Sequence, residues 1–177
     1  MDSSAQIETL RAAIRDVPDF PKPGIVFKDI TTLLRDAGLF RRSLDLLSVL
    51  CGDLAADKVV AIESRGFILG GALALRLGAG FVPVRKPGKL PWKSRQASYE
   101  LEYGQDALEI HEDALRPGER VLIVDDVIAT GGTARAVGQL ADSLGATVTG
   151  FVFLVELGFL GGRAKLEGRE VRSLIRY

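Results

Sequence analysis

The residues from 121 to 133 combine an apolar stretch, two adjacent carboxylates and a turn rich in threonine and glycine, in the order VLIVDDVIATGGT. Gly131 and Gly132 allow the backbone to approach a ligand closely, and successive N–H groups at the start of a helix can hold a phosphate dianion. The hydroxyls of Thr130 and Thr133 would add two donors. The spacing predicts a phosphate-binding loop between a strand and a helix.

Asp125 and Asp126 stand at the end of the apolar stretch, beside the predicted loop. Carboxylates in this place can accept hydrogen bonds from sugar hydroxyls or help to order a metal ion. A simpler interpretation stays open, in which a plain glycine turn follows a core strand and both acids face solvent. The pair of acids followed by Thr-Gly-Gly-Thr favours the ligand-binding interpretation.

A second candidate is a basic run without any acid between residues 85 and 95. Its cations are Arg85, Lys86, Lys89, Lys93 and Arg95. A run of charge usually forms a solvated face. Because Pro87, Gly88 and Pro91 prevent a regular element, we expect a mobile lid that brings cations to an anionic ligand.

Several other kinds of site are excluded by the sequence. No GxGxxG motif follows a predicted strand, and Gly88-Lys89 lacks the spaced glycine and the following Ser or Thr of a Walker loop. The single cysteine, Cys51, excludes an internal disulfide, and the single histidine, His111, excludes a histidine-only metal site. Because 23 basic residues balance 23 acidic ones, no global positive field is available to hold a nucleic acid.

The chain alternates predicted strands with predicted helices, and these elements must position the candidate residues. The strands are expected at residues 58–62, 81–84, 121–124 and 148–157, and the helices at 67–77 and 133–144. This alternation predicts a single α/β domain over residues 1–177, with a mostly parallel, doubly wound sheet flanked by helices. Ligands of such sheets bind beyond the carboxyl ends of the strands, where the loop after Val124 must lie.

The remaining segments complete the predicted domain. A helix is expected from Ser3 to Val17, a loop over residues 18–24, and another helix over 39–54. An insertion from Arg85 to Pro117 contains two alternating segments, 99–103 and 107–111, which predict an antiparallel hood over the carboxyl edge.

Length and composition agree with this scheme. The 177 residues are 47% apolar and 26% charged, which is typical of a globular domain with a proper core. The N-terminus has no signal-peptide pattern, and no stretch approaches the ~18 apolar residues of a membrane-spanning helix. We therefore expect a cytoplasmic protein without a membrane partner.

Six segments, in order along the chain, resemble the type I phosphoribosyltransferases, and together they are similar to the adenine-specific members of that family. They are residues 18–30 (PDFP and GIVFKDI), 63–67 (ESRGF), 85–91 (RK and GKLP), 99–104 (YELEYG), 125–133 and 155–157 (VEL). The resemblance implies transfer of a phosphoribosyl group from phosphoribosyl diphosphate (PRPP) to adenine. The products would be AMP and diphosphate, the cofactor Mg²⁺, and the assembly a homodimer.

The resemblance also assigns roles to individual residues. Those expected at the 5′-phosphate and ribose of PRPP are Asp125, Asp126, Ala129, Thr130, Gly131, Gly132 and Thr133. Those expected at the diphosphate are Glu63, Ser64, Arg65, Arg85, Lys86 and Lys89. The adenine site would use main-chain groups of Val26 and Lys28, with Phe27 and Leu157 on the two faces of the ring. Glu102 would be the general acid/base, and Mg²⁺ would reach the site through PRPP, diphosphate and water, without a direct protein ligand.

Two alternatives stay open on the sequence. One is a phosphoribosyltransferase for another purine base, such as hypoxanthine or xanthine. The other is a regulator that binds PRPP without turnover. The second alternative requires a DNA-binding module, and the sequence has neither an extra domain nor a surplus of basic residues.

Overall fold

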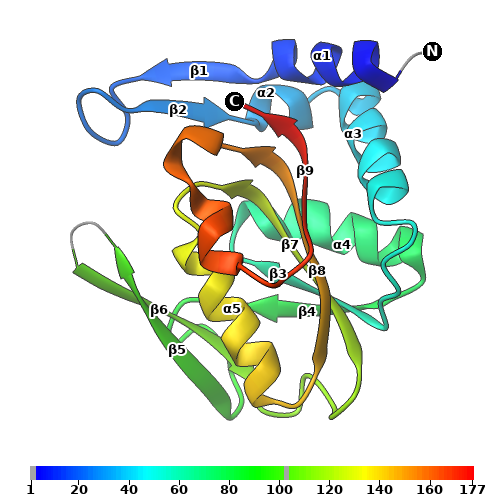
Figure 1. Ribbon diagram of the computed structural model, residues 1–177, viewed down its shortest axis with the longest axis vertical. Helices are drawn as coiled ribbons and strands as arrows, with labels where there is room; N and C mark the ends of the chain where they lie inside the picture. Colours follow the sequence, from blue (N-terminus) through cyan, green and yellow to red (C-terminus); the bar gives the residue numbers. More distant parts are fainter. Residues whose placement is uncertain (1–2, 102–103) are drawn as a thin grey trace. The chain divides into compact units, whose positions relative to one another are not determined.

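The computed structural model describes residues 3–101 and 104–177, of which residues 100, 101, 104 and 105 are described by their backbone alone. The chain divides into two compact units, Met1–Leu46 and Leu47–Tyr177, and each is described by itself. Figure 1 labels their helices and strands. The expected single domain over residues 1–177 stays a prediction.

The first unit holds two helices, a two-stranded antiparallel sheet and the start of a third helix. In chain order these are α1 (Ser3–Ala13), β1 (Arg15–Pro18), β2 (Val26–Asp29), α2 (Thr31–Leu34) and α3 (Ala37–Leu50), which continues into the second unit. The predicted first helix was wrong at its end, because Arg15–Pro18 is a strand. Val17 precedes a proline, and a residue in that position is restricted to extended conformations.

A five-stranded parallel sheet forms the centre of the second unit, in the order β4-β3-β7-β8-β9. Its strands are β3 (Lys58–Ile62), β4 (Gly80–Val84), β7 (Arg120–Ile128), β8 (Thr147–Glu156) and β9 (Val171–Arg176). The four expected strands are present, whereas β9 was not foreseen. Two short 3₁₀ helices between β8 and β9, η1 (Gly158–Leu160) and η2 (Gly162–Leu166), were not foreseen either.

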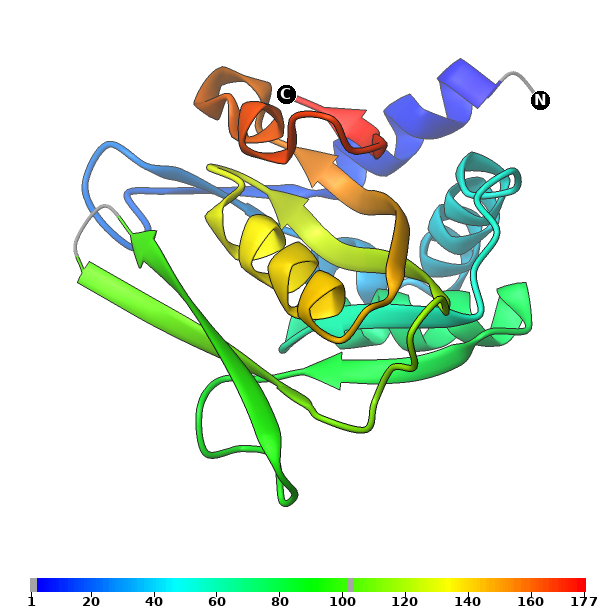
Figure 2. The same ribbon diagram turned by 60° about the horizontal axis from the view of Figure 1, so that its bottom comes forward.

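The helices α4 (Arg65–Leu77) and α5 (Gly132–Ser143) cover opposite faces of this sheet, as Figures 1 and 2 show. From the centre of the sheet, β3–α4–β4 steps toward one edge and β7–α5–β8 toward the other. Because crossovers between parallel strands are almost always right-handed, the change of direction places the two helices on different faces. The predicted doubly wound arrangement is confirmed.

The insertion forms an antiparallel hairpin of β5 (Ser94–Leu101) and β6 (Gly104–His111). Tyr99 lies opposite Asp106 in its register. The predicted antiparallel pair is confirmed, although the strands begin earlier than expected. Glu102 lies outside the described residues, so its predicted role is not tested by the structure.

The core of the second unit explains why the apolar segments became strands. Val121, Leu122, Ile123 and Val124 are fully buried, as expected for a central strand with a helix on each face.

Within the described part of the chain, no helix has the length and apolar character needed to cross a membrane.

Candidate active site

The candidate residues of the second unit lie at the carboxyl ends of the neighbouring strands β3 and β7. The two strands pair in parallel from Lys58 with Val121 to Ala61 with Val124. The segment 63–65 follows β3 and the loop 129–131 follows β7, so both leave the same edge of the sheet. The structure therefore brings together the predicted ribose-phosphate residues and Arg65.

The position of the two acids differs from the sequence prediction. Asp125 and Asp126 do not follow the strand, because β7 continues to Ile128. The reason is its second neighbour: β8 pairs with β7 beyond Val124, with Asp125 opposite Phe153. The acids thus lie within β7, past the last residue that pairs with β3.

Each acid has its own partner. Asp126 is 4% exposed and forms an ion pair with Arg65, with 2.7 Å between Oδ2 and Nε. Asp125 Oδ1 accepts a hydrogen bond of 2.9 Å from the backbone N–H of Asp126. The same oxygen lies only 2.6 Å from the point where a Cβ on Gly66 would stand. The Arg65–Asp126 ion pair therefore joins the start of α4 to the end of β7, and Asp125 packs closely against Gly66.

Burial makes both acids harder to ionise. Desolvation raises the pKa of Asp125 well above its ordinary value, and the neighbouring charge of Asp126 raises it further. Desolvation also raises the pKa of Asp126, although Arg65 opposes this effect. A ligand that donates hydrogen bonds or carries positive charge would stabilise the ionised forms.

A cavity of about 90 Å³ lies at the start of α5. Gly131 precedes the helix with a φ of +77°, a conformation that favours glycine. Residues 129–131 and Thr133 line the cavity together with Asp125, whereas Asp126 faces Arg65 instead. A phosphate or a sugar hydroxyl in this cavity would meet backbone N–H groups, the helix N-terminus and a carboxylate.

Gly162 is a functional candidate that the sequence reasoning missed. A Cβ on Gly162 would lie 2.1 Å from the backbone oxygen of Ala129, and one on Gly131 would lie 2.2 Å from the oxygen of Gly162. The backbone of η2 thus packs directly behind the phosphate loop. No local signal could have shown this contact, because about 30 residues separate the two glycines in the sequence.

The predicted diphosphate residues form a cluster organised by Glu63. Its Oε2 accepts hydrogen bonds from Arg85 Nε at 2.9 Å and from the backbone N–H of Lys86 at 3.1 Å. Arg85 Nη1 also donates to the backbone oxygen of Lys89 at 3.1 Å. The peptide bond between Glu63 and Ser64 is cis. Glu63 therefore joins the loop after β3 to the basic run after β4.

Tyr99 and Asp106 link the hairpin to this cluster, and neither was predicted as a site residue. The Tyr99 hydroxyl donates to Asp106 Oδ2 at 3.2 Å, and Lys86 Nζ lies 3.6 Å from the same oxygen. Burial raises the pKa of Tyr99, an effect that a hydrogen bond with Thr133 opposes. The hairpin thus contacts both the basic run and the phosphate loop.

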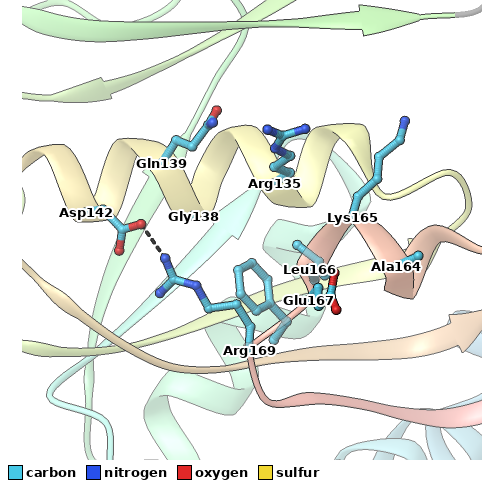
Figure 3. Close-up of a pocket in the computed structure, with 10 residues that line it drawn as sticks. Arg135, Gly138, Gln139, Asp142, Ala164, Lys165, Leu166, Glu167 and Arg169 are labelled. Carbon is cyan, nitrogen blue, oxygen red and sulfur yellow. Dashed lines mark hydrogen bonds and ion pairs between the residues drawn. The ribbon is translucent and has the colours of Figure 1, made fainter.

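Another cavity, of about 500 Å³, lies between α5 and residues 164–169 (Figure 3). An ion pair of 2.5 Å between Arg169 and Asp142 spans one end of it. No residue predicted to bind substrate lines this cavity. The candidate site and this groove are therefore different places on the second unit.

The predicted adenine residues belong to both units. Val26 lies opposite Pro18 and Lys28 opposite Asp16 in the β1–β2 sheet. Because Pro18 has no N–H, the Val26–Pro18 pair cannot exchange two hydrogen bonds, and the antiparallel alternation directs the main-chain groups of Val26 and Lys28 away from β1. Phe27 packs edge-on against Phe20, with ring centroids 5.2 Å apart.

Leu157, the predicted adenine residue of the second unit, directly follows β8. Its backbone N–H donates to the oxygen of Ile128 at 2.9 Å. The last residue before the phosphate loop is thus bonded to the residue expected at the base.

Comparison with known proteins identifies the family. The model of the phosphoribosyl transferase domain matches residues 45–173. An adenine phosphoribosyltransferase of Symbiobacterium thermophilum is 56% identical over 167 residues, which are 94% of this chain and 98% of that protein. The chain belongs to the adenine phosphoribosyltransferase family. The family resemblance of the sequence is thereby confirmed.

Solved structures of this family agree with the observed fold. The enzyme of Thermoanaerobacter pseudethanolicus gives a TM-score of 0.95 at 53% identity, over 97% of this chain and 99% of that one. The enzyme of Saccharomyces cerevisiae, solved with an imino-altritol bisphosphate and adenine, gives a TM-score of 0.90 at 44% identity over 97% and 99%. The type I phosphoribosyltransferase fold is therefore confirmed for this family member.

Proposed function

We propose that this chain transfers the 5-phosphoribosyl group of PRPP to adenine and releases AMP and diphosphate. The observation that carries the proposal is the cavity at the start of α5, which combines a phosphate-binding helix terminus with the carboxylate of Asp125. Relatives named for adenine at 56% identity, and the yeast relative solved with adenine, favour this base over hypoxanthine and turnover over a regulatory role.

The phosphate loop and the acids fix the ribose end of PRPP. Backbone N–H groups of residues 129–133 hold the 5′-phosphate, with the Thr130 and Thr133 hydroxyls as additional donors. Asp125 accepts hydrogen bonds from the ribose hydroxyls, and Asp126 keeps Arg65 at the same edge. Positioning of the ribose contributes much of the catalysis in such a displacement.

The basic cluster holds the diphosphate as it leaves. Arg65, Arg85, Lys86 and Lys89 supply the positive charge, and Ser64 supplies a further donor. Glu63 carries a negative charge, so its role is to position Arg85 and the backbone of Lys86 rather than to contact the diphosphate. These cations stabilise the negative charge that develops on the diphosphate while the ribose acquires oxocarbenium character.

Magnesium fits this site as an ion carried by the substrate. Hard oxygen donors suit Mg²⁺, and Asp125 is a partly desolvated carboxylate in the cavity that a nearby cation would help to ionise. Over residues 3–101 and 104–177, no group of three or more His, Cys, Asp or Glu side chains is arranged to hold a metal. The ion would neutralise charge on the diphosphate while PRPP, diphosphate and water supply its ligands.

Adenine is selected through the protein backbone. Main-chain groups of Val26 and Lys28 would pair with the amino group and the ring nitrogen of adenine, and Phe27 and Leu157 would cover the faces of the ring. Hypoxanthine reverses this donor and acceptor pattern, so that buried groups would be left unpaired. Glu102 would accept the ring proton as the base attacks.

The remaining proposals rest on the sequence pattern and, for the assembly, on the family resemblance. They are an undivided domain, a homodimeric assembly and a cytoplasmic location. Size-exclusion chromatography with light scattering tests the homodimer.

One assay tests the function. The protein is mixed with PRPP, Mg²⁺ and adenine, hypoxanthine or guanine in turn, and the nucleotide is measured by chromatography. We expect AMP, with adenine preferred by orders of magnitude in kcat/KM. Comparable turnover of hypoxanthine would overturn the base assignment, and binding of PRPP without any nucleotide would overturn the enzymatic one.

A further inference from the structure

Glu156, at the end of β8, is a buried charge that the proposed chemistry does not use. It is 3% exposed. Arg163 holds it with two contacts, 2.7 Å from Nη2 to Oε2 and 3.2 Å from Nε to Oε1. The Ser173 hydroxyl donates to the same carboxylate, and Arg176 Nε lies 3.7 Å from Oε1. These donors hold the pKa of Glu156 below its ordinary value, so the carboxylate stays ionised.

Each residue of this ion pair is adjacent in sequence to a residue that contacts the start of the phosphate loop. Glu156 lies opposite Ile128 in the β7–β8 register, and the next residue, Leu157, donates its N–H to the oxygen of Ile128. Arg163 follows Gly162, whose backbone packs against Ala129. The residue before the loop, Ile128, and its first residue, Ala129, are therefore contacted by two segments, and both segments are attached to Glu156.

Arg163 also donates hydrogen bonds to the sheet, and these bonds hold η2 against β9. Its Nη1 donates to the backbone oxygen of Val171 at 2.5 Å, and its Nη2 donates to Ser173 Oγ at 3.3 Å. Val171 and Ser173 both belong to β9. The short helix η2 spans Gly162–Leu166, and these side-chain bonds, together with the buried Leu166, fix where Gly162 stands.

We propose that the Glu156–Arg163 ion pair is a positioning pair that sets the shape of the 5′-phosphate cradle through Gly162. The inference rests on the proposed function, because it requires residues 129–133 to hold the phosphate of PRPP. It assigns a role to two residues that lie 23 or more positions beyond residue 133 in the sequence. The pair acts on the ribose-phosphate end of the substrate and not on the diphosphate end, whose cations lie in other loops.

Ribose 5-phosphate and diphosphate are suitable probes, because each represents one end of PRPP. Arg163→Lys keeps the charge but removes the forked contact with Glu156. We expect about 10-fold weaker binding of ribose 5-phosphate by calorimetry, since this corresponds to the loss of about one hydrogen bond to the charged phosphate. Diphosphate binding should change less than about 2-fold, and the KM for PRPP should rise more than kcat falls.

Arg172→Lys is the matched control. Arg172 lies on β9, where it makes a forked contact with Asp53 and a single contact with Glu170. Its replacement should lower the melting temperature without changing the affinity for ribose 5-phosphate. Equal losses for both probes in Arg163→Lys, or unchanged binding of ribose 5-phosphate, would overturn the positioning role.

Gly162→Ala keeps the test decisive if Arg163→Lys does not fold. The new Cβ must displace the Ala129 carbonyl. We therefore expect weaker binding of ribose 5-phosphate and unchanged binding of diphosphate. Gly161→Ala strains the same turn at a φ of +64°, but its Cβ meets nothing within 4 Å, so it controls for the turn. Normal binding by folded Gly162→Ala overturns the inference, whereas wild-type protein that forms no AMP overturns the proposed function instead.

Discussion

Three glycines on α4 allow the effect of a Gly→Ala substitution on catalysis to be distinguished from its effect on stability. Gly66, Gly70 and Gly71 lie on the same helix, but a Cβ would meet a different environment at each. On Gly66 it would meet Asp125, on Gly70 it would meet the core, and on Gly71 it would meet nothing within 4 Å. Replacement of each by alanine should therefore give three different outcomes.

Gly66→Ala should impair catalysis more than folding. Its Cβ would stand 2.6 Å from Asp125 Oδ1 and 3.3 Å from the backbone oxygen of Val124. The carboxylate must move by about 0.8 Å to reach an ordinary contact of 3.4 Å. A shift of this size at a positioning group predicts a loss of about 10- to 100-fold in kcat/KM for PRPP.

Gly70→Ala should impair folding and leave the site intact. Its Cβ would stand 2.5 Å from the Cβ of Ala61 on β3, so helix and sheet must separate. Overpacking of a core costs roughly 1–3 kcal/mol. Alanine recovers about 0.5–1 kcal/mol through its helix propensity, and the melting temperature changes by about 2–4 °C for each kcal/mol.

Gly71→Ala is the control for the series. With open space around its Cβ, it should stabilise the protein by about 0.5–1 kcal/mol and leave kcat/KM unchanged. Thermal unfolding and initial rates of AMP formation measure both quantities for all three variants. If Gly66→Ala keeps the wild-type kcat/KM, the position of Asp125 is not critical and the proposed ribose contact is refuted.

Three further outcomes are expected. Glu102→Gln should lower kcat by ~10²–10⁴-fold with little change in PRPP affinity, whereas Glu100→Gln should cost far less; the reverse order in steady-state kinetics would mean that Glu100 is the general acid/base. Burial raises the pKa of the Cys51 thiol to about 12, so native protein should resist a thiol reagent at pH 8 and react only in denaturant, and rapid native labelling would contradict this burial. The hydrogen bond from Arg120 lowers the pKa of Asp57 from 3.8 to about 2. The resulting contribution to stability is present above pH 4 and lost as the pH falls toward 2. In urea unfolding, Asp57→Asn should therefore be less stable than the wild type at pH 7, and a difference that persists at pH 2 would refute the linkage.

The sheet of the second unit could be predicted because its sequence signals are local. Apolar runs such as Val121–Val124 determine buried strands, and the helical segments between them follow from spacing. The end of β7 could not be located, because two polar residues interrupt the apolar run. Pairing with β8, a tertiary interaction, extends the strand through both acids.

The segment after Leu157 shows a different limit. No helix or strand was predicted after residue 157, so the strand β9 was missed. The requirement for glycine at position 162 comes from the carbonyl of Ala129, which no spacing rule relates to it. Likewise, Glu63 matched a diphosphate motif by type and order, but only its contacts with Arg85 and Lys86 indicate a positioning role.

The energetics of the two acids argue for a ligand more strongly than their spacing does. The charge of Asp126 adds to the desolvation that hinders the ionisation of Asp125, and Arg65 forms its ion pair with Asp126. A neutral group of the same shape at position 125 would avoid this cost, because a desolvated carboxylate without a directly bonded cation destabilises the folded state. The structure instead surrounds Asp125 with Gly66 on one side and the phosphate-loop cavity on the other. Sugar hydroxyls that donate to this carboxylate remove the penalty, so that the same interaction that destabilises the free protein favours binding of the ribose.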